Sequence, residues 1–395
     1  MPARDRRPLR VSFRETLLAI LPGMLVALVA SVAAAQPPAR SQPPAQSQPP
    51  ARSQPGPLFV YGISYTEDRA AVARLSTGDD GPSFEVVQSI PLGCKGAAIA
   101  HHPRLGLVYT VCKNGHGGVF RTQPDGRLEK IRDVEFHGGY CWLSFDATGR
   151  WLLGASYESG AVDVHGLDAD GMPTTLADSR DMGRKMAHSV GVSPDNRFAY
   201  AGFVKEENAL CQFAFDAGAG RLTSLDPATA EIPADFGPRH VVFHPTQPWV
   251  YFSGEQQLGV AGFCIGTDGR LGPPRIAAPP KVAPGKGLAG SDIVISPDGK
   301  FLFVGIRGFE DPLQAVVTYA VAGDGRAEPV CVTETDAIPW AIDITPGGDR
   351  LLVSAARPGT LTSYTIRPDG GLVKEAAVEI GKDFWDIVVA PAPAR

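Results

Sequence analysis

The sequence predicts an all-β fold, a seven-bladed β-propeller, and three observations lead to this prediction. Glycine (45 residues) and proline (36) make up about a fifth of the 395 residues, which disfavours helical bundles because both residues are costly inside helices. A phrase of strand, turn and strand recurs every 44 to 52 residues, a period typical of propellers and solenoids. The two ends of the repeating region carry complementary halves of one further repeat, which would close a ring.

The first 35 residues are typical of a bacterial export signal. Five arginines against two acidic residues give a basic start, the stretch from Leu17 to Ala35 is largely apolar, and residues 33–35 (Ala-Ala-Ala) offer a small-residue cleavage site. Arg6 and Arg7 also resemble a twin-arginine signal, whose route exports folded proteins. We therefore expect a periplasmic or secreted protein. The alternative is an uncleaved membrane anchor, since about 19 apolar residues could just span a bilayer.

Residues 36–56 repeat Gln-Pro-Pro-Ala-Arg-Ser almost perfectly, which predicts an extended linker because the segment has almost no apolar side chains to pack. The signal and the linker together carry five net positive charges, so the formal charge of -5 for the whole chain leaves about -10 on residues 57–395. An acidic domain argues against general binding of nucleic acid. The whole chain is 44% hydrophobic and 20% charged, which is enough for a buried core and excludes wholesale disorder.

Residues 57–395 contain six full copies of the repeat and one split copy. Each full copy has a short apolar strand, a turn similar to Ser-Pro-Asp-Gly, and a second strand rich in aromatic and β-branched residues; the clearest turns are those at Pro194 and Pro297. Most copies continue into a third apolar stretch that ends in a turn with Asp and Gly, as at residues 267–271. Such turns between apolar runs are typical of hairpins, so each repeat predicts a four-stranded antiparallel blade.

The split copy predicts how the ring closes. Residues 58–63 (Leu-Phe-Val-Tyr-Gly-Ile) resemble the second strand of a repeat without its first, and residues 385–391 resemble a first strand without its second. Pairing of these N- and C-terminal strands within one blade would leave no open edge there. We therefore predict one domain of seven blades over residues 57–395, with a six- or eight-bladed ring as the alternative.

Superposing the copies on the turn residue gives two variable columns. The column at the start of the first strand contains Ala97, Cys141, His188, Arg239, Ser291, Trp340 and Trp385. The column at the end of the second strand contains Ser64, Lys113, Tyr157, Val204, Glu255, Arg307 and Ala356. Because the two strands form a hairpin, both columns should ring one mouth of the central channel. A wet channel mouth accepts any polar residue, but scaffolding favours small or repeated residues, so ionisable and aromatic residues on neighbouring blades indicate a site.

At these residues the chain resembles the lactonase family of seven-bladed propellers, which includes bacterial 6-phosphogluconolactonase and fungal carboxy-muconate cyclase. The resemblance covers nearly all of residues 57–395 and is most specific in residues 237–245 (Gly-Pro-Arg-His-Val-Val-Phe-His-Pro) and 291–304. It implies a catalytic set of His188, Arg239, Glu255 and Arg307. One departure follows Tyr200, where family members usually have a sequence close to Asp-Leu-Gly and this chain has Gly-Phe-Val-Lys-Glu-Glu-Asn at residues 202–208. This departure puts the substrate contacts of the fourth blade in doubt and allows a specialised or lost activity.

These residue types suit the opening of a lactone ring. Glu255 and His188 can divide the base and acid roles, and Arg239 and Arg307 offer forked donors for an oxyanion, a carboxylate or a phosphate. The alternative for each arginine is an ordinary ion pair with Glu255 or Asp292. The residues predicted to bind the substrate are His240, Asp292, Lys113, Trp340, Trp385 and Tyr157.

The sequence therefore predicts a monomeric hydrolase, similar to 6-phosphogluconolactonase, that opens a small anionic or polar lactone of the sugar type. Two alternatives stay open: a lactonising cycloisomerase of the muconate type, and a propeller that binds a ligand or protein in the cell envelope without catalysis. We expect no cofactor, no nucleic acid, and membrane contact only through an uncleaved N-terminal segment. We also expect no metal, because the columns offer only Glu255, with Asp292 and Asp386 one position further along.

Two further expectations concern cysteines and histidines. The spacing of the six cysteines fixes no pairing, and we expect mostly buried free thiols. His101 and His102 precede a turn at the far end of the strand from the mouth, and we expect them to face solvent.

Overall fold

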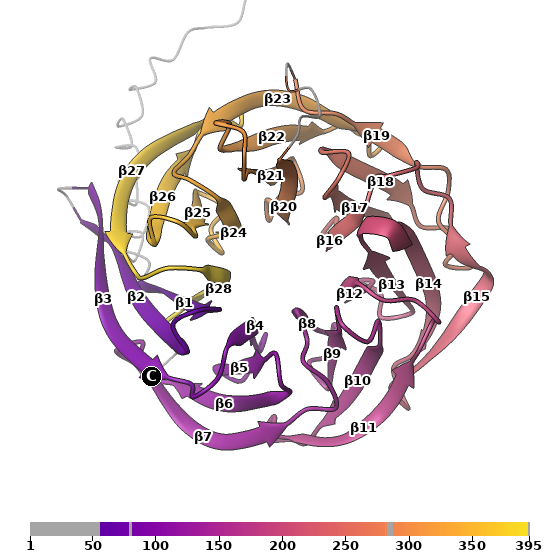
Figure 1. Ribbon diagram of the computed structural model, residues 1–395, viewed down its shortest axis with the longest axis horizontal. Helices are drawn as coiled ribbons and strands as arrows, with labels where there is room; N and C mark the ends of the chain where they lie inside the picture. The colour runs from indigo at the N-terminus through magenta and orange to yellow at the C-terminus, as the bar shows by residue number, and fades with distance from the viewer. Residues whose placement is uncertain (1–55, 79–80, 281, 283–286, 394–395) are drawn as a thin grey trace, which may run out of the picture. The chain divides into compact units, whose positions relative to one another are not determined.

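The computed structural model describes residues 56–78, 81–280, 282 and 287–393. Within these residues 28 strands form seven four-stranded antiparallel sheets, which surround a central channel as blades (Figure 1). One short 3-10 helix, η1 (Lys205–Glu207), follows the second strand of the fourth blade. In the part of the chain that the structure describes, no helix is long and apolar enough to cross a membrane. The predicted signal and all but the last residue of the predicted linker lie outside the described residues.

Each blade runs from an innermost strand at the channel to an outermost strand at the rim. The innermost strands are β28 (Phe384–Pro391), β4 (Gly96–His101), β8 (Trp142–Phe145), β12 (Ala187–Val192), β16 (Pro238–Phe243), β20 (Leu288–Ile295) and β24 (Pro339–Ile344). The second strands are β1 (Leu58–Ser64), β5 (Leu107–Cys112), β9 (Trp151–Ala155), β13 (Phe198–Phe203), β17 (Trp249–Gly254), β21 (Phe301–Gly308) and β25 (Arg350–Ala355). The third strands are β2 (Arg69–Gly78), β6 (His116–Thr122), β10 (Val162–Leu167), β14 (Ala209–Asp216), β18 (Val260–Cys264), β22 (Ala315–Val321) and β26 (Thr360–Ile366). The outermost strands are β3 (Gly81–Pro91), β7 (Leu128–Glu135), β11 (Pro173–Arg180), β15 (Arg221–Ala230), β19 (Arg275–Ala277), β23 (Ala327–Glu334) and β27 (Leu372–Glu379).

The ring closes through the two ends of the repeating region, as predicted. The first blade has the order β28-β1-β2-β3, and β1 pairs antiparallel with β28 from Leu58 opposite Pro391 to Ser64 opposite Phe384. Figure 1 shows the yellow C-terminal strand beside the indigo N-terminal one. The predicted count of seven blades is therefore confirmed, and β1, the first strand of the described chain, is paired on both sides, with β28 and with β2.

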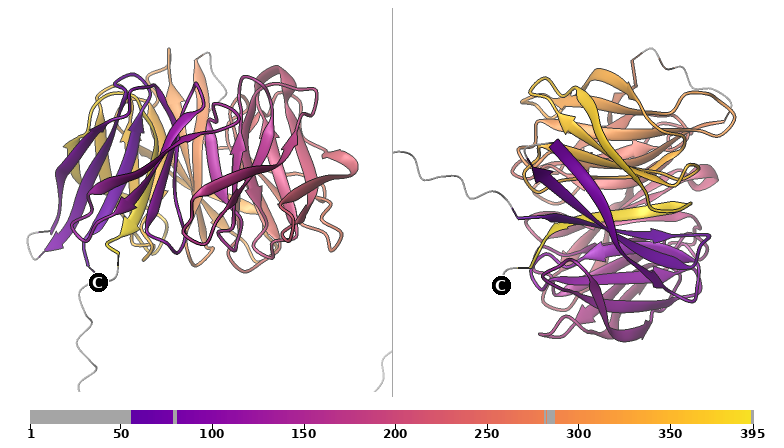
Figure 2. Two further views of the ribbon diagram at one scale, coloured as in Figure 1. Left: turned by 90° about the horizontal axis from the view of Figure 1, so that it is seen from below. Right: turned by 90° about the vertical axis from the view of Figure 1, so that its left-hand side faces the viewer.

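The core lies between the faces of neighbouring blades. The second strands β5 and β13 are buried along their whole length, and in the other second strands only the first residue is partly exposed. The outermost strands have at most one fully buried residue each. The side views in Figure 2 show the strands of each blade crossing the thickness of the ring. Glycine is needed where one blade's outer turn meets the next: at Gly269, with φ of 84°, a Cβ would lie 2.1 Å from the ring of Phe198. The carbonyl of Gly269 also accepts a hydrogen bond from the Tyr200 hydroxyl at 2.7 Å.

The residue before each turn at the far end of the innermost hairpin is buried and bonds to the turn. His102 is only 3% exposed, and its Nδ1 accepts hydrogen bonds from the backbone N–H groups of Arg104 and Leu105, each at 3.1 Å. The expectation that His102 faces solvent was therefore wrong. His101 is half-buried. At this position the histidine caps the turn, because its ring nitrogen lies within hydrogen-bond reach of the amides that follow it.

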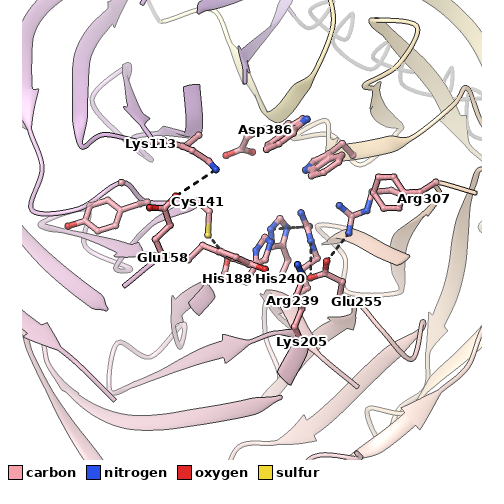
Figure 3. A pocket seen from close by; sticks show the side chains of 17 residues that line it. Lys113, Cys141, Glu158, His188, Lys205, Arg239, His240, Glu255, Arg307 and Asp386 are labelled. Atoms are coloured by element: carbon pink, nitrogen blue, oxygen red, sulfur yellow. Dashed lines mark hydrogen bonds and ion pairs between the residues drawn. The ribbon is translucent and has the colours of Figure 1, made fainter. Parts of the chain in front are cut away.

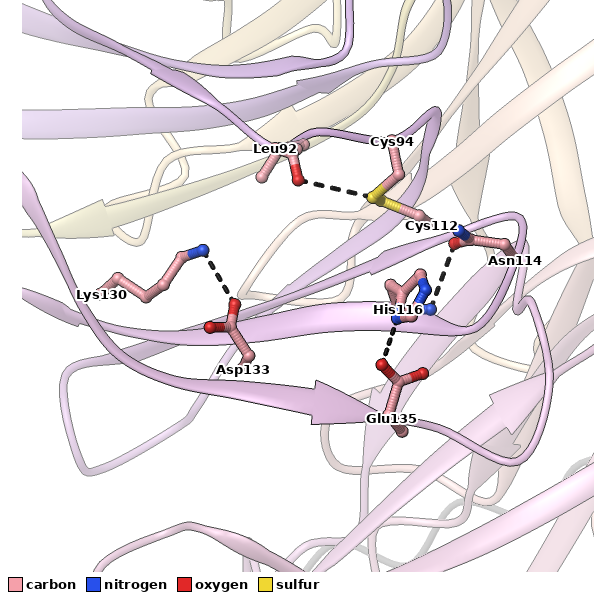
Figure 4. The surroundings of a disulfide bond; sticks show 8 residues. All are labelled: Leu92, Cys94, Cys112, Asn114, His116, Lys130, Asp133 and Glu135. Atoms are coloured by element: carbon pink, nitrogen blue, oxygen red, sulfur yellow. Dashed lines mark hydrogen bonds and ion pairs between the residues drawn. A yellow bond between two sulfur atoms is a disulfide. The ribbon is translucent and has the colours of Figure 1, made fainter.

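Two of the six cysteines form a disulfide that the sequence did not predict. Cys94, in the loop before β4, is bonded to Cys112 at the end of β5 (Figure 4). Cys141, Cys211, Cys264 and Cys331 are free, and of these only Cys211 is fully buried. The expectation of free thiols therefore holds for four of the six cysteines, but the expectation of burial was wrong for three of these four. Their spacing carried no signal because Cys94 lies in a loop, outside the repeating columns.

Candidate active site

β-bulges aim the residues of the first column into the channel mouth. His188 lies at a register shift of β12 against β13, between paired residues 187 and 189. In the next blade the shift spans two residues, Arg239 and His240, and in the blade after that it spans Ser291 and Asp292. A bulge bends the strand and re-aims its side chains, so two consecutive residues can serve the site from one blade.

A cavity of about 420 Å³ occupies this mouth (Figure 3). Its volume is within the range of small-molecule sites. Nine of the ten predicted site residues line it: His188, Arg239, Glu255, Arg307, His240, Lys113, Tyr157, Trp340 and Trp385. The tenth, Asp292, lies behind His240. Four members of the two columns, Ser64, Val204, Ser291 and Ala356, do not line the cavity.

The carboxylate of Glu255 lies between two buried guanidinium groups. Its Oε2 is 4.0 Å from Nε of Arg239, and its Oε1 is 3.5 Å from Nη2 of Arg307. Both arginine side chains are 2% exposed. The predicted alternative of ion pairs with Glu255 thus holds for both arginines. The distances are long for charge-assisted hydrogen bonds, however, so both guanidinium groups keep donors for a ligand.

Backbone and aromatic contacts hold Arg307 in place. Its Nη2 donates to the carbonyl oxygen of Gly290, and its guanidinium carbon lies 4.4 Å from the centre of the Trp340 ring. Burial and the neighbouring charge of Arg239 lower the pKa of Arg307 to about 9, although Glu255 acts in the opposite direction. Arg307 therefore stays charged at neutral pH, at a cost in desolvation.

His240 and Asp292 form a buried hydrogen-bonded pair. His240 Nδ1 is 2.6 Å from Asp292 Oδ1, and the backbone N–H groups of Ile293 and Ile342 also point at this carboxylate, at 2.8 and 3.1 Å. Since Asp292 is the acceptor, Nδ1 carries the proton and Nε2 is left free. Burial raises the pKa of Asp292 to about 6, against the opposing effect of Arg239. The carboxylate is thus largely ionised at neutral pH and fixes the orientation of the imidazole.

The two histidines of the site are held in the neutral form. Their rings are adjacent, with centres 5.0 Å apart. Nη1 of Arg239 lies 3.2 and 3.1 Å from the two ring nitrogens of His240, which places the guanidinium over the face of the imidazole. Burial and the charge of Arg239 hold the pKa of His188 and of His240 well below the usual range. Both rings can accept protons or hydrogen bonds at neutral pH, but neither is an imidazolium acid.

Comparison with known proteins places this arrangement in a family. Residues 60–383 match the family model described as lactonase, 7-bladed beta-propeller. The chain belongs to the lactonase family. It is 28% identical to the 6-phosphogluconolactonase of Cronobacter sakazakii over 262 residues, which are 64% of this chain and 74% of that protein. It is also 28% identical to the 6-phosphogluconolactonase of an Enterobacter species over 271 residues, 65% of this chain and 76% of that one.

Solved structures show the same fold. The periplasmic gluconolactonase of Pseudomonas aeruginosa superposes with a TM-score of 0.72 at 23% identity, over 85% of this chain and all of that one. The lactonase fold is therefore common to both, and the site must be argued from this chain's own residues.

Several buried polar atoms in this lactonase-family site have no hydrogen-bond partner within the described residues. They are His188 Nδ1, Arg239 Nε, Glu255 Oε2, Arg307 Nε and Trp385 Nε1. A buried polar atom without a partner costs free energy, so native structures leave few of them. Five such atoms around one cavity mean that the site is built to receive a ligand or water molecules with both donors and acceptors.

Three stacked aromatic rings form one wall of the cavity, and a cationic side chain lies at each end of the stack. Tyr65 stacks on Trp385 with ring centres 3.7 Å apart, and Trp385 stacks on Trp340 at 4.3 Å. Arg307 covers the far face of Trp340, and Lys113 lies over Tyr65 with its Nζ 4.8 Å from the ring centre. Because the ring faces cover one another, the wall presents ring edges to a ligand, and these carry the positive end of the aromatic quadrupole.

Sequence reasoning missed part of the rim. Lys205, Glu158, Phe309 and Tyr140 also line the cavity. Glu158 and Lys205 each directly follow a column residue, so the column plus one position would have found them. Lys205 opens η1 with φ of 54°, in the segment that departs from the family pattern, and a hydrogen bond with Tyr157 raises the pKa of its ammonium group.

Proposed function

We propose that this lactonase-family propeller hydrolyses a sugar-type lactone by general acid–base chemistry in the cavity at the channel mouth. The observation that carries the proposal is a set of buried atoms that make no hydrogen bond within the described residues: Nε of Arg239, Nε of Arg307, and Oε2 of Glu255, which is 4.0 Å from Arg239 Nε. A lactone carbonyl that gains negative charge needs such donors, and an attacking water needs such an acceptor.

In the proposed reaction Glu255 Oε2 takes a proton from a water molecule as its oxygen bonds to the lactone carbonyl carbon. Arg239 and Arg307 stabilise the tetrahedral oxyanion through their free N–H groups. Collapse of the oxyanion breaks the bond to the ring oxygen, which needs a proton from an acid. Since its pKa lies well below the usual range, His188 does not fit the acid role expected from sequence; we assign it and His240 to hydrogen bonding with the substrate.

The charge of the cavity indicates an anionic or strongly polar substrate. Arg239, Arg307, Lys113 and Lys205 line it against the carboxyl groups of Glu158, Glu255 and Asp386, in a domain that is acidic as a whole. The relatives named 6-phosphogluconolactonase support a lactone as the substrate class. We propose a monomer that acts without a bound cofactor and does not bind nucleic acid.

We further propose that the protein works in the periplasm or outside the cell. The basic and apolar N-terminal sequence supports export, and the Cys94–Cys112 disulfide suits an oxidising compartment. A phosphorylated lactone made in the cytosol is then an unlikely encounter, which favours an unphosphorylated sugar lactone.

The test is a hydrolysis assay on a panel of lactones with the wild type, Glu255→Gln and His188→Asn. We expect turnover of at least one sugar lactone, a loss of kcat of about 10²- to 10⁴-fold in Glu255→Gln, and a mainly raised KM in His188→Asn. Tight binding of lactones or sugar acids without turnover would favour the non-catalytic propeller instead. Turnover that is equal in all three proteins would reject this site.

A further inference from the structure

Three aspartates on innermost strands form a ladder along one side of the channel. Asp292 of β20 accepts the backbone N–H of Ile342 on β24 at 3.1 Å. Asp343 of β24 accepts that of Val389 on β28 at 2.7 Å, and Asp386 of β28 accepts that of Ile99 on β4 at 2.9 Å. Each carboxyl group thus bridges its own blade to the next.

Burial and mutual repulsion raise the pKa of the two ladder members that have no charged partner, Asp343 and Asp386. Asp292 has His240 as a partner, whereas neither Asp343 nor Asp386 has an ion pair within the described residues. Enclosure by protein raises the pKa of Asp343 to about 7, and Asp292 adds to this by repulsion. Enclosure, followed by repulsion from Asp292 and Asp343, raises the pKa of Asp386 well above the usual range, although the amides of Ile99 and Ile387 oppose the shift.

Only one of the two unpaired members reaches the cavity. Asp386 lines it, next to Trp385, and Asp343 does not. Figure 3 shows Asp386 on the opposite side of the cavity from Glu255. A lactone bound between them would have the attacking water on the Glu255 side and its ring oxygen free to face Asp386.

We infer that Asp386 is the general acid of this site, the group that protonates the ring oxygen of the lactone as the ring opens. The inference rests on the proposed hydrolysis and fills the role that the neutral histidines leave empty. As the bond between the carbonyl carbon and the ring oxygen breaks, its electron pair goes to that oxygen, which takes the carboxyl proton of Asp386. The proton that Glu255 took from water passes to solvent, and Asp386 regains a proton from solvent. The products are a hydroxy carboxylate and one proton.

The groups around Asp386 determine how its activity depends on pH. The titratable groups on the elements packed against β28, and across the channel wall, are Tyr61 of β1, His101 of β4, Asp343 of β24, Arg350 of β25 and Asp292 of β20. After burial, which is the largest cause, the two aspartates are the titratable groups among these that shift the pKa of Asp386, and both raise it. Because the acid form is the active one, activity is lost as pH rises through the pKa of Asp386, and retained below it.

The experiment compares two kinds of leaving group. A lactone with an alkyl alcohol as leaving group needs the acid, whereas dihydrocoumarin expels a phenol, with a pKa of about 10, and needs it much less. For Asp386→Asn, which keeps an oxygen for the Ile99 amide, we expect kcat to fall by about 10²- to 10³-fold on the alkyl lactone and by less than about fivefold on the phenolic one. Asp343→Asn is the matched control, since it removes a ladder carboxyl that does not line the cavity. Because loss of its repulsion lowers the pKa of Asp386, the control is assayed at a pH where Asp386 stays protonated in both proteins, and there it should change the kcat on both substrates equally and little.

Two results would overturn the inference. One is an equal loss of kcat on the alkyl and the phenolic lactone in Asp386→Asn. The other is a loss of kcat in Asp343→Asn that is likewise larger on the alkyl lactone. If Asp386→Asn does not fold, the wild type provides the second measurement. Its kcat on the alkyl lactone, corrected for uncatalysed hydrolysis, should fall at high pH while its kcat on the phenolic lactone does not, and parallel profiles would reject the acid role. Absence of any turnover by the wild type would instead reject the proposed function itself.

Discussion

The two ends of the innermost hairpins differ in whether their buried polar side chains are hydrogen-bonded. At the turn end, the residue before the turn is buried in six blades and bonds to the amides of its own turn. These residues are His102, Asp146, Ser193, His244, Ser296 and Thr345. At the mouth end, the equivalent residues differ from blade to blade, and His188, Arg239 and Arg307 each keep a buried atom without a partner.

This difference separates the residues that stabilise every blade from the residues that serve ligand binding. The turn end serves the same purpose in every blade, so its polar groups are satisfied within a few residues of the chain. The mouth end carries desolvated charge that the fold does not satisfy, and such groups persist in native proteins mainly where they serve function. Substitutions at the two ends should therefore separate stability from activity.

The largest expected effect is at the mouth. Replacing Arg307 by methionine keeps the length of the side chain but removes the donors for the oxyanion. We expect kcat/KM on a sugar lactone to fall by about 10²- to 10³-fold. The free energy of unfolding should stay the same or rise, because a lowered pKa means that folding disfavours the charged guanidinium. Urea unfolding and lactone kinetics on the same preparation measure both, and a loss of stability with activity retained would contradict the comparison.

At the turn end we expect the reverse. Asp146 accepts hydrogen bonds from the N–H groups of Arg150 and Trp151 at 2.8 and 2.9 Å and from the Asn196 amide of the next blade at 2.9 Å. Asp146→Ala should lower the free energy of unfolding by about 3 kcal/mol and leave kcat/KM within about twofold. Burial raises the pKa of Asp146, but hydrogen bonds, chiefly from Thr148, hold it below the usual range. The part of the stability difference that depends on ionisation should therefore be full above about pH 4 and be lost as pH falls through the lowered pKa of Asp146.

The sequence was sufficient for the ring and for most of the cavity. Repetition of the turns fixed the number of blades, the split copy fixed the pairing of β1 with β28, and two columns located ten residues of the cavity. These features depend on local patterns that every blade repeats, which is why a single sequence reveals them.

What the sequence could not show depends on contacts between distant segments. His240 and Asp292 were predicted as site residues, but their contact was not, because neither the bulges that expose two consecutive residues nor the hydrogen bond between the two side chains has a pattern of its own in the sequence. Lys205 enters the cavity because η1 begins with a positive φ, in a segment without counterpart in the other blades. The raised pKa of Asp386 comes from burial in the assembled ring and, after it, from aspartates on two other blades.

A smaller effect should appear in the dependence on pH. The free rings of unfolded histidines bind protons below about pH 6.5, whereas His188 and His240 stay neutral in the fold, so stability should fall as pH drops below that value. The activity of the folded protein should not fall with its stability, so the pH profile of kcat/KM should show no change of slope near pH 6.5. At the turn end, burial also lowers the pKa of His102. His102→Asn, whose Oδ1 can cap the same amides, should weaken the pH dependence of stability and leave the activity profile unchanged. An activity limb at pH 6.5 that disappears in His188→Asn would contradict this account.

The smallest expected effect is at the rim of the cavity, where Lys205 contributes both a charge to the site and a strained backbone to the fold. Its ammonium group lines the cavity, and its backbone has a φ of 54°, which costs a residue other than glycine roughly 1 kcal/mol. Lys205→Met and Lys205→Gly both remove the charge, so each should raise KM for an anionic lactone by about two- to fivefold, leave KM for a neutral lactone unchanged, and leave kcat unchanged. Only the glycine variant relieves the backbone, so it alone should unfold at a higher urea concentration than the wild type. Equal stability of the two variants would show that the backbone of η1 is unstrained, and equal KM shifts for charged and neutral lactones would show that Lys205 contributes shape to the mouth and not charge.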